Sequence, residues 1–480
     1  MIATLIEEHR APETPTDARG RIAWALVEFA RNPYVSLVFM FVFAPYFAAT
    51  VVGDAVRGQE IWSLSYTIAG LCIAVIAPVL GAIVDRMGSR KPWILGSVAV
   101  MAPACWALWY AMPGLHGGLP LVFICVLIVV LMLGYECGSV AHNAMLPSLA
   151  SGRQIGRLSG LGLGAGATGS LCVQVVVLFG IFLPAAPGVD WSFLPSQPLF
   201  GLNPATFEHA RIVGPIAAVW MSIFIIPLWL WTPDRPATGI GVRRAIREGF
   251  QQLVITVKRA RQVSNVGMFL SARMLYNDGM SAVQAYCGIY AAGVFGWDLA
   301  TIMIFALILS VACVLGGFMG GWLDGRFGSR GAILISLTLT CLAVLVAVSV
   351  TPTEVFFFPY DAAAAGPVWS FPYFRTLPEL IYLLTYIVLA ITITAIIVNG
   401  RAMMARVAPL SMMSQFFGLY ALSGTATAFL GHGMVALFTG LFHSQRAGFA
   451  SLLALLVAGS LLVLRVREER APELTQVESA

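Results

Sequence analysis

Two short stretches of sequence, half a chain apart, decide the fold. Residues 81–90 read GAIVDRMGSR, and residues 320–330 read GGWLDGRFGSR. Each stretch joins an aspartate to a GSR triplet and lies in a short polar gap between two long apolar blocks. The triplets begin at positions 88 and 328 of a 480-residue chain. Because self-similarity at a fixed period marks a duplicated unit, the sequence predicts two related halves.

The composition places these halves in a membrane. Hydrophobic residues make up 59% of the chain and charged residues 11%, whereas a soluble domain has about 45–50% apolar and about 25% charged residues. These figures exclude an ordinary soluble enzyme, a disordered regulator and a nucleic-acid-binding protein, and they make the lipid bilayer a partner. The eight cysteines lie inside apolar blocks without CxxC pairs, so the sequence predicts no metal site and no cofactor.

Twelve apolar blocks are long enough to cross a bilayer, which takes about 20 mostly apolar residues per helix. The predicted spans of the first half are 24–52, 61–84, 93–112, 119–146, 158–184 and 212–231. Those of the second half are 265–295, 299–323, 331–350, 379–405, 415–439 and 447–466. We therefore expect an all-α membrane protein with 12 transmembrane helices in two pseudo-symmetric six-helix halves.

The basic residues indicate which side of the membrane each loop faces. With the N-terminus inside, 23 of the 28 Lys and Arg residues lie in cytoplasmic loops, tails or span ends. Such an excess is the positive-inside pattern and predicts that both termini are cytoplasmic. The predicted divisions are a cytoplasmic tail (1–23), an N-terminal six-helix half (24–231), a basic cytoplasmic linker (232–264), a C-terminal six-helix half (265–466) and a cytoplasmic tail (467–480).

The two repeated loops resemble the signature loop of the major facilitator superfamily, which lies between the second and third spans of each half. Glycines suit a tight turn there, and the aspartate suits a helix cap or an arginine partner across the interface between the halves. Breaking such a pair would favour either the inward-facing or the outward-facing state. In the alternative interpretation, these charges only fix how the spans are oriented in the membrane. The matching residues are Gly81, Asp85, Arg86, Gly88, Arg90 and Lys91, and then Asp324, Arg326, Gly328 and Arg330.

A narrower likeness covers both halves. Residues 24–47, 142–160, 271–296 and 414–431 are similar to the branch related to the autophagy-linked vacuolar amino-acid effluxers and their bacterial members. The chain departs from that branch at 28–31, where it reads EFAR instead of Asp-Trp-Ala-Asn. His142 replaces a common Tyr, and His432 a common Pro. The resemblance implies an exporter of amino acids, and the departures bear on the substrate.

Polar residues inside the predicted spans are the candidate site. A charge at a helix centre costs about 2.5–3.5 kcal/mol on insertion scales, so such residues are candidates for function. They lie on the first and fourth spans of each half, which line the central cavity in the fold that the resemblance implies. The candidates are Glu28, Arg31, Glu136, Arg273, Tyr276, Asn277, Asp278, Asn399 and Arg401.

The chemistry of these candidates points to a charged solute. The donor fork of Arg273 suits a carboxylate, and Glu136 or Asp278 suits an ammonium group or a proton. A cavity with both signs favours a zwitterion, although an internal Arg–carboxylate pair explains the same residues. Glu28 and Arg31, three apart, favour a local ion pair over a site. A lone histidine near a span end, His142, is more often simply hydrogen-bonded than proton-coupling.

The glycines of the fifth and eighth spans suggest how the halves meet. The fifth span carries five glycines between 160 and 169, and the eighth carries four between 316 and 321. Small residues four apart let backbones approach closely. In the implied fold these spans face each other, so we expect a sliding glycine contact between the halves.

The sequence thus predicts a non-enzymatic secondary transporter that moves a small polar organic solute by alternating access. An amino acid is favoured, and proton coupling and monomeric state are expected. The same fold carrying a sugar, peptide, drug-like or lipid-like cargo is the alternative, and a polytopic membrane enzyme or sensor a remote one. Lysine occurs only at 91 and 258. That bias towards arginine suggests a GC-rich bacterial genome and hence a bacterial cytoplasmic (inner) membrane.

Overall fold

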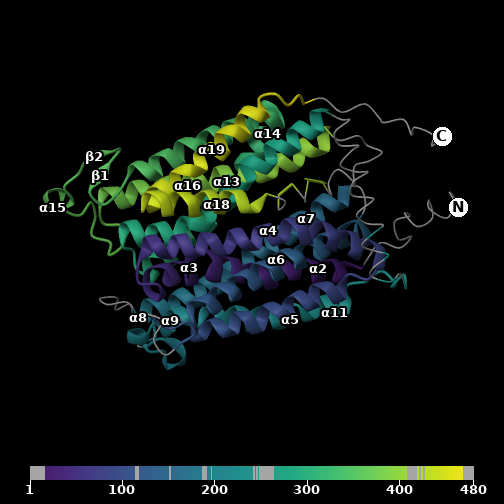
Figure 1. The fold of residues 1–480 in the computed structure, drawn as a ribbon, viewed down its shortest axis with the longest axis horizontal. Coiled ribbons are helices and arrows are strands. Elements are labelled where there is room, and N and C mark those ends of the chain that lie inside the picture. Colours follow the sequence, from purple (N-terminus) through teal and green to yellow (C-terminus); the bar gives the residue numbers. More distant parts are fainter. Residues whose placement is uncertain are drawn as a thin grey trace.

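The protein is almost wholly helical, and its helices form two elongated bundles that lie side by side (Figure 1). Helices from α2 to α11 form one bundle, and helices from α13 to α19 form the other. The computed structural model describes residues 17–113, 118–150, 153–185, 192–195, 197–239, 264–407 and 427–468, with positions 241, 244, 247, 419, 420, 423 and 424.

The first bundle begins with a helix that is only partly α-helical. Two π-helical segments, η1 and η2, interrupt the first predicted span on either side of the short helix α3. The elements of this span are α2 (Ala18–Pro33), η1 (Tyr34–Phe41), α3 (Phe43–Tyr46) and η2 (Phe47–Val51). The others are α4 (Ala55–Met87), α5 (Lys91–Ala107), η3 (Leu108–Tyr110), α6 (Leu121–Leu149), α7 (Arg153–Val177), η5 (Leu178–Phe182), α8 (Leu183–Ala185), η6 (Leu199–Gly201), η7 (Pro204–Thr206), α9 (Glu208–Arg211), α10 (Val213–Phe224) and α11 (Ile226–Trp231).

The second bundle carries a small hairpin at one end, which we call the hairpin end of the molecule (left in Figure 1). The opposite end, which holds Gly88 and Gly328, is called the loop end. The elements are α13 (Ser264–Phe295), α14 (Leu299–Ser349), β1 (Glu354–Val355), β2 (Phe358–Pro359), α15 (Ala362–Ala365), α16 (Leu377–Val407), α18 (Ala428–Phe442) and α19 (Gln445–Val463).

Apart from 415–439, the predicted spans coincide with these helices except at their ends. Helix α18 covers only the later part of 415–439, and most of the earlier part lies outside the described residues. Among the described residues, nine helices are long and apolar enough to cross a membrane. One of them, α14, contains two predicted spans, and its helix is broken at Gly328, where φ is 71°. The polar helix α13 and the shorter α18 are not among the nine. Most of the predicted linker lies outside the described residues, so the linker, the twelve-span count and the cytoplasmic termini stay predictions.

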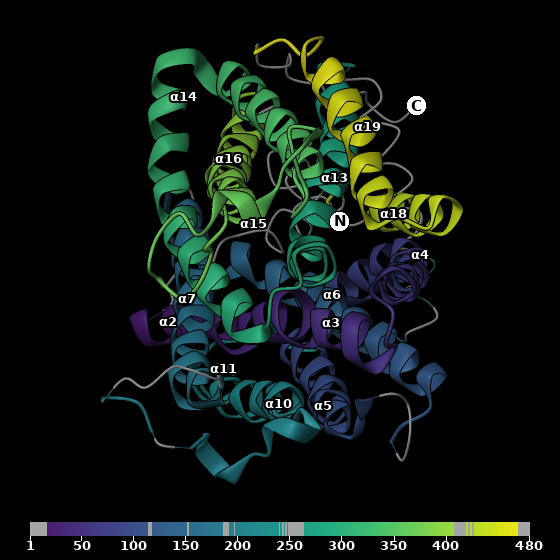
Figure 2. The ribbon, with the colours of Figure 1, turned by 90° about the vertical axis from the view of Figure 1, so that its left-hand side faces the viewer.

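The two bundles touch along a surface that runs to the hairpin end. Across it α4 packs along α18, η1 packs against α13, and α7 packs against α14. Figure 2, which looks onto the hairpin end, shows α4 beside α18 at this boundary. Helix α4 approaches α18 closely at Gly70, where an added methyl group would lie 2.8 Å from the backbone nitrogen of Phe429.

The glycines of the fifth and eighth predicted spans have other neighbours than expected. Gly169 of α7 lies against the backbone of Phe29 in α2, and Gly316 of α14 lies against Ile391 in α16. The expected glycine contact between the halves is therefore wrong, because these glycines serve the close packing of helices inside each bundle. The spans themselves do meet, and Ser310 donates a hydrogen bond of 3.2 Å to Gln174.

Candidate functional site

On the first bundle, the candidate residues gather around the carboxylate of Glu28. Arg31 donates to Glu28 Oε1 at 3.0 Å, as the spacing of three residues predicts, and Asn32 donates to Oε2 at 3.5 Å. Arg31 is 1% exposed, and its guanidinium lies 4.8 Å from the centre of the Tyr135 ring. Glu136, the next residue on α6, interacts electrostatically with both Glu28 and Arg31. This group therefore brings two acids to one buried arginine.

His142 is fixed against the same carboxylate. Its ring stacks on Trp24 with centroids 4.3 Å apart and planes 15° apart. Nε2 lies 2.9 Å from the carbonyl oxygen of Trp24, and Trp24 Nε1 donates to the carbonyl oxygen of His142 at 3.1 Å. Nδ1 lies 3.1 Å from Glu28 Oε1. The sequence did not point to Trp24, because no local spacing links residues 118 positions apart.

On the second bundle, Arg273 of α13 holds residues 420 and 423. Its Nη1 donates to the carbonyl oxygen of Tyr420 and to Ser423 Oγ, both at 2.7 Å, and its guanidinium lies 3.7 Å from the centre of the Tyr420 ring. Asn277, one helical turn further along, donates to the carbonyl oxygen of Gly424 at 3.1 Å. Two predicted residues thus anchor the chain that precedes α18, and neither Tyr420 nor Ser423 was among the predicted residues.

The neighbouring residues of α13 are more deeply buried. Asp278 is 2% exposed, and its carboxylate makes no hydrogen bond of ordinary geometry within the described part of the chain, although the Thr427 hydroxyl faces it. Tyr276 is 1% exposed and packs against α19 at Gly459. A buried carboxylate facing a single hydroxyl is costly to keep ionised, so Asp278 remains a candidate site residue.

The two predicted residues on α16 have different surroundings. Asn399 is fully buried and donates to the carbonyl oxygens of Gly320 at 3.1 Å and Ala395 at 2.8 Å, so it joins α16 to α14. Arg401 is partly exposed and interacts electrostatically with Arg273 on its own bundle and with Glu28 on the other. Arg401 is therefore the charge that relates the two groups to each other.

A second contact between the bundles is built around His432 of α18. His432 is 4% exposed, and its Nδ1 lies 2.8 Å from the hydroxyl of Tyr286. Its ring centre lies 5.1 Å from Tyr66 and 6.4 Å from Phe39, which both belong to the first bundle. Nearer the hairpin end, Gln59 donates to Thr439 Oγ1 at 2.9 Å. Aromatic and polar side chains thus join the bundles between the charged groups and the hairpin end.

The first signature loop is bound by the chain that follows α11. Gly88 has a φ of 84°, as a tight turn requires. The carboxylate of Asp234 accepts the backbone N–H groups of Arg90 and Lys91, each at 2.9 Å. The Arg90 side chain, 4% exposed, donates to Ser148 Oγ at 3.3 Å. The side chains of Asp85 and Arg86 lie outside the described part, while Gly81 faces Val140 and Lys91 Nζ donates to the carbonyl oxygen of Trp229.

The second signature loop has an acid at the corresponding place. Glu468, which follows α19, accepts the backbone N–H of Ser329 at 2.9 Å and pairs with Arg406. Arg406 also pairs with Asp324 at 2.8 Å. Because Arg406 lies on α16, the expected partner across the interface between the halves is wrong for Asp324, whose arginine comes from the same bundle. The remaining loop residues are Arg326, 5.9 Å from the Phe327 ring, and Arg330, which donates to the carbonyl oxygen of Leu464.

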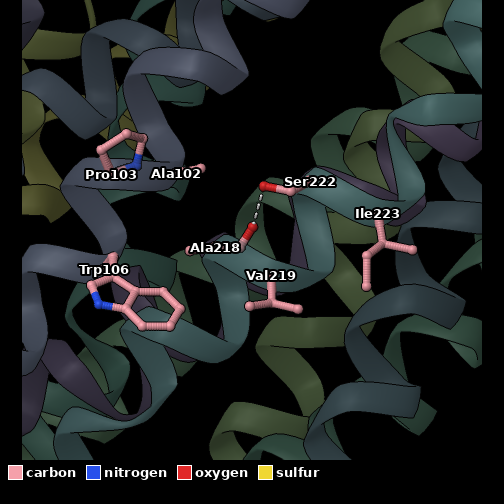
Figure 3. A pocket seen from close by; sticks show the side chains of 7 residues that line it. All are labelled: Ala102, Pro103, Trp106, Ala218, Val219, Ser222 and Ile223. Atoms are coloured by element: carbon pink, nitrogen blue, oxygen red, sulfur yellow. Dashed lines mark hydrogen bonds between the residues drawn. The ribbon is translucent and has the colours of Figure 1, made fainter.

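Two surface hollows are lined by residues other than these charged groups. One, of about 370 Å³, lies between α5 and α10 and is lined by apolar side chains such as Trp106 and Ile223 (Figure 3). Its one hydroxyl, that of Ser222, donates to the carbonyl oxygen of Ala218 at 2.7 Å (Figure 3). Another, of about 300 Å³, lies between α14 and α16 and is similarly apolar. Hollows of this kind suit lipid chains and not a polar solute.

Comparison with known proteins adds a family to this geometry. Residues 48–474 match the family described as "Vacuole effluxer Atg22 like". The uncharacterised MFS-type transporter YxiO of Bacillus subtilis (strain 168) is 22% identical, over 95% of this chain and 97% of its own length. Autophagy-related protein 22 of Yarrowia lipolytica is also 22% identical, over 70% of this chain and 54% of its own length.

Solved structures share the fold. The D-xylose–proton symporter has a TM-score of 0.60 at 12% sequence identity and covers 94% of this chain and 97% of its own. A POT family transporter in complex with 5-aminolevulinic acid has a TM-score of 0.57 at 13% identity, covering 92% and 95%. At such identities the likeness shows the fold alone.

Proposed function

We propose that this protein carries a small zwitterion such as an amino acid. The premise is that the chain belongs to the Atg22-like vacuole effluxer family and is a membrane transporter of the major facilitator type. The single observation that supports this cargo is an electrostatic interaction between opposite charges of the two bundles, Glu28 of the first and Arg401 of the second. A solute with one carboxylate and one ammonium group would complement charges of both signs.

Each end of such a solute has chemically suitable partners. The guanidinium groups of Arg401 and Arg273 suit a carboxylate, because their planar donors match its two oxygens. Glu136 suits an ammonium group, whose three donors need acceptors. Both groups are partly exposed rather than sealed. A neutral sugar would offer these partly exposed charges no opposite charge, which argues for the zwitterion over the sugar alternative.

The same proposal includes the mechanism. Twelve helices in two halves would rock about the charged groups, with both termini in the cytoplasm and the protein acting as a monomer in a bacterial inner membrane. The contacts of Gln59 and His432 support a state that is shut towards the hairpin end. The family resemblance leads us to expect export. The gradients of the solute and of the coupled proton set the direction of net transport.

The test is counterflow of labelled amino acids in proteoliposomes that contain the purified protein. We expect at least one amino acid to exchange, and Arg401→Gln to slow its exchange by about tenfold or more, because a lost charged hydrogen bond costs roughly 1.5–3 kcal/mol. Arg57→Gln is the matched control, since Arg57 is exposed at the hairpin end and away from the cluster.

Two outcomes would overturn the proposal. The amino-acid cargo is wrong if none of the twenty amino acids exchanges while another solute does. The site is wrong if Arg401→Gln and Arg57→Gln exchange the same amino acid equally fast. Thermal unfolding of each variant, measured in detergent, separates a lost site from a lost fold.

A further inference from the structure

We propose that His142 and Glu28 together form the proton-binding site of this protein, an inference that rests on the proposed function only for its link to solute movement. The two residues lie on different helices, α6 and α2, and the family resemblance gives no hint of the pair, because a Tyr is common at position 142. The observation that carries the proposal is that both ring nitrogens of His142 face atoms that only accept hydrogen bonds.

The first ring nitrogen has one possible hydrogen-bonding role. Nε2 lies 2.9 Å from the carbonyl oxygen of Trp24. A carbonyl oxygen has no hydrogen to give, so Nε2 carries the hydrogen of this bond. In a neutral imidazole the other nitrogen, Nδ1, then has a lone pair and no hydrogen.

The second ring nitrogen faces the carboxylate of Glu28. Nδ1 lies 3.1 Å from Oε1, an ion-pair distance, although off the line of an ideal hydrogen bond. A lone pair on Nδ1 would repel an ionised carboxylate at that distance. The arrangement is favourable when Nδ1 carries one further proton, because Arg31 donates to the same oxygen and Oε1 acts there as an acceptor. The geometry is therefore that of an ion pair between a protonated His142 and Glu28.

The ring has no room to avoid this arrangement. His142 is fully buried, its ring is stacked on Trp24, and Trp24 is in turn bonded to the carbonyl oxygen of His142. On the far side, Gly162 of α7 lies against the Trp24 ring. A flipped ring would place C–H groups where the two nitrogens now meet oxygen atoms. The stack therefore keeps Nδ1 pointed at Glu28.

The neighbouring charges connect this proton to the solute site. The charged and titratable groups around the pair are Arg31 on α2, Tyr135 and Glu136 on α6, and Arg401 on α16. Helix α7 presents Gly162 and Gly166 to Glu28. A bound proton makes this group more positive, which favours the binding of a carboxylate beside it. Because such coupling is reciprocal, proton and carboxylate promote each other's binding.

Ring-nitrogen NMR of protein labelled with ¹⁵N-histidine tests the pair without any solute. The chain has six histidines, and His142→Gln identifies the signals of residue 142. We expect both ring nitrogens of His142 to carry hydrogen in the wild type, and only one of them in Glu28→Gln. His443→Asn is the control, because His443 is exposed and its loss leaves the His142 signals unchanged. Identical ring states in wild type and Glu28→Gln would overturn the proposal.

Transport of labelled amino acids then tests the coupling. A wild-type carrier that moves one proton per solute accumulates solute about tenfold under a gradient of one pH unit. We expect His142→Gln to keep exchange between equal pH values and to lose this accumulation. Accumulation that survives in His142→Gln but is lost in Asp278→Asn would overturn the proposal and place the proton on α13. If no amino acid moves in the wild type, the proposed function fails, and the NMR result still decides the pair.

Discussion

The loop around Gly88 and the loop around Gly328 come from one repeat, but they are held in different ways. In the first loop, Asp234 accepts hydrogen bonds from the backbone N–H groups of Arg90 and Lys91. In the second loop, Glu468 accepts the backbone N–H of Ser329 and also pairs with Arg406, which in turn pairs with Asp324. The common element is an acid that follows the last helix of each bundle and caps the turn. The difference is that the second acid belongs to a network of side chains.

The two glycines of these loops show the same contrast. A methyl group at Gly88 would collide with the carbonyl oxygen of Pro236, which is backbone. A methyl group at Gly328 would lie 2.5 Å from Oε2 of Glu468, which is the end of a flexible side chain. The first loop is therefore the more rigid of the two, and changes in it should cost more stability.

The largest expected effect is that of Gly88→Ala. Both glycines have positive φ, so alanine is strained at either position. We expect Gly88→Ala to lower the free energy of unfolding by about 3 kcal/mol and Gly328→Ala by about 1–2 kcal/mol, because only the second clash can be relieved by a side chain. Unfolding of the purified variants, followed by tryptophan fluorescence during heating, measures the difference. Equal losses would contradict the contrast between the loops.

Removal of the capping acids should have a smaller effect. Asp234→Ala leaves the N–H groups of Arg90 and Lys91 at the start of α5 without their cap, which costs about 1–2 kcal/mol. Glu468→Ala should cost about 1 kcal/mol or less, because Arg406 is 41% exposed and such pairs are weak. Asp234→Asn is the matched control, since it keeps an acceptor oxygen. The same melting experiment applies, and a larger loss in Glu468→Ala would contradict the comparison.

The smallest expected effect is a dependence on pH that the second loop should show through Glu468. Partial burial acts to raise the pKa of Glu468, but the hydrogen bonds from Arg406 and from the Ser329 backbone outweigh it, so its pKa lies below the usual range. The stabilisation by Glu468 is therefore complete above the usual value of about 4.3 and is lost as the pH falls through the lowered value.

Melting temperatures of wild type and Glu468→Gln, measured from neutral pH down to about pH 3, test this sign. We expect the gap between the two proteins to close on acidification. A gap that widens as the pH falls would show that Glu468 is stabilised in its protonated form, opposite to the network described above.

The helices and the turns were predictable because local sequence determines them. Blocks of apolar residues predicted the long helices, and Gly88 and Gly328 predicted the turns where positive φ occurs. The pair of Glu28 and Arg31 also followed from spacing along one helix. By contrast, Asp234 and Glu468 were not recognised as loop partners. Each acid lies about 140 positions from the loop it caps, so no spacing rule relates them.

The candidate site was predictable as a set of residues and not as an arrangement. Hydropathy shows that Arg273 and Arg401 are charged residues in apolar surroundings. It does not show that Arg273 holds Tyr420 or that Arg401 faces Glu28. For the same reason, Asn399 was grouped with the solute site, although its amide joins two helices of one bundle. Such distinctions depend on helix rotation, which single-sequence patterns do not contain.

The close approach of α4 to α18 has a consequence for the entropy of the transport cycle. Glycines form this contact on both helices, at Gly70 on α4 and at Gly433 and Gly440 on α18. A glycine has no rotamers to lose, whereas ordering a long side chain costs up to about 2 kcal/mol. At these glycine positions, closing the two bundles therefore orders no side chain of the glycines themselves, and the ordered side chains are those of neighbours such as Gln59 and His432. We expect the balance between open and closed states to vary little with temperature on account of this contact.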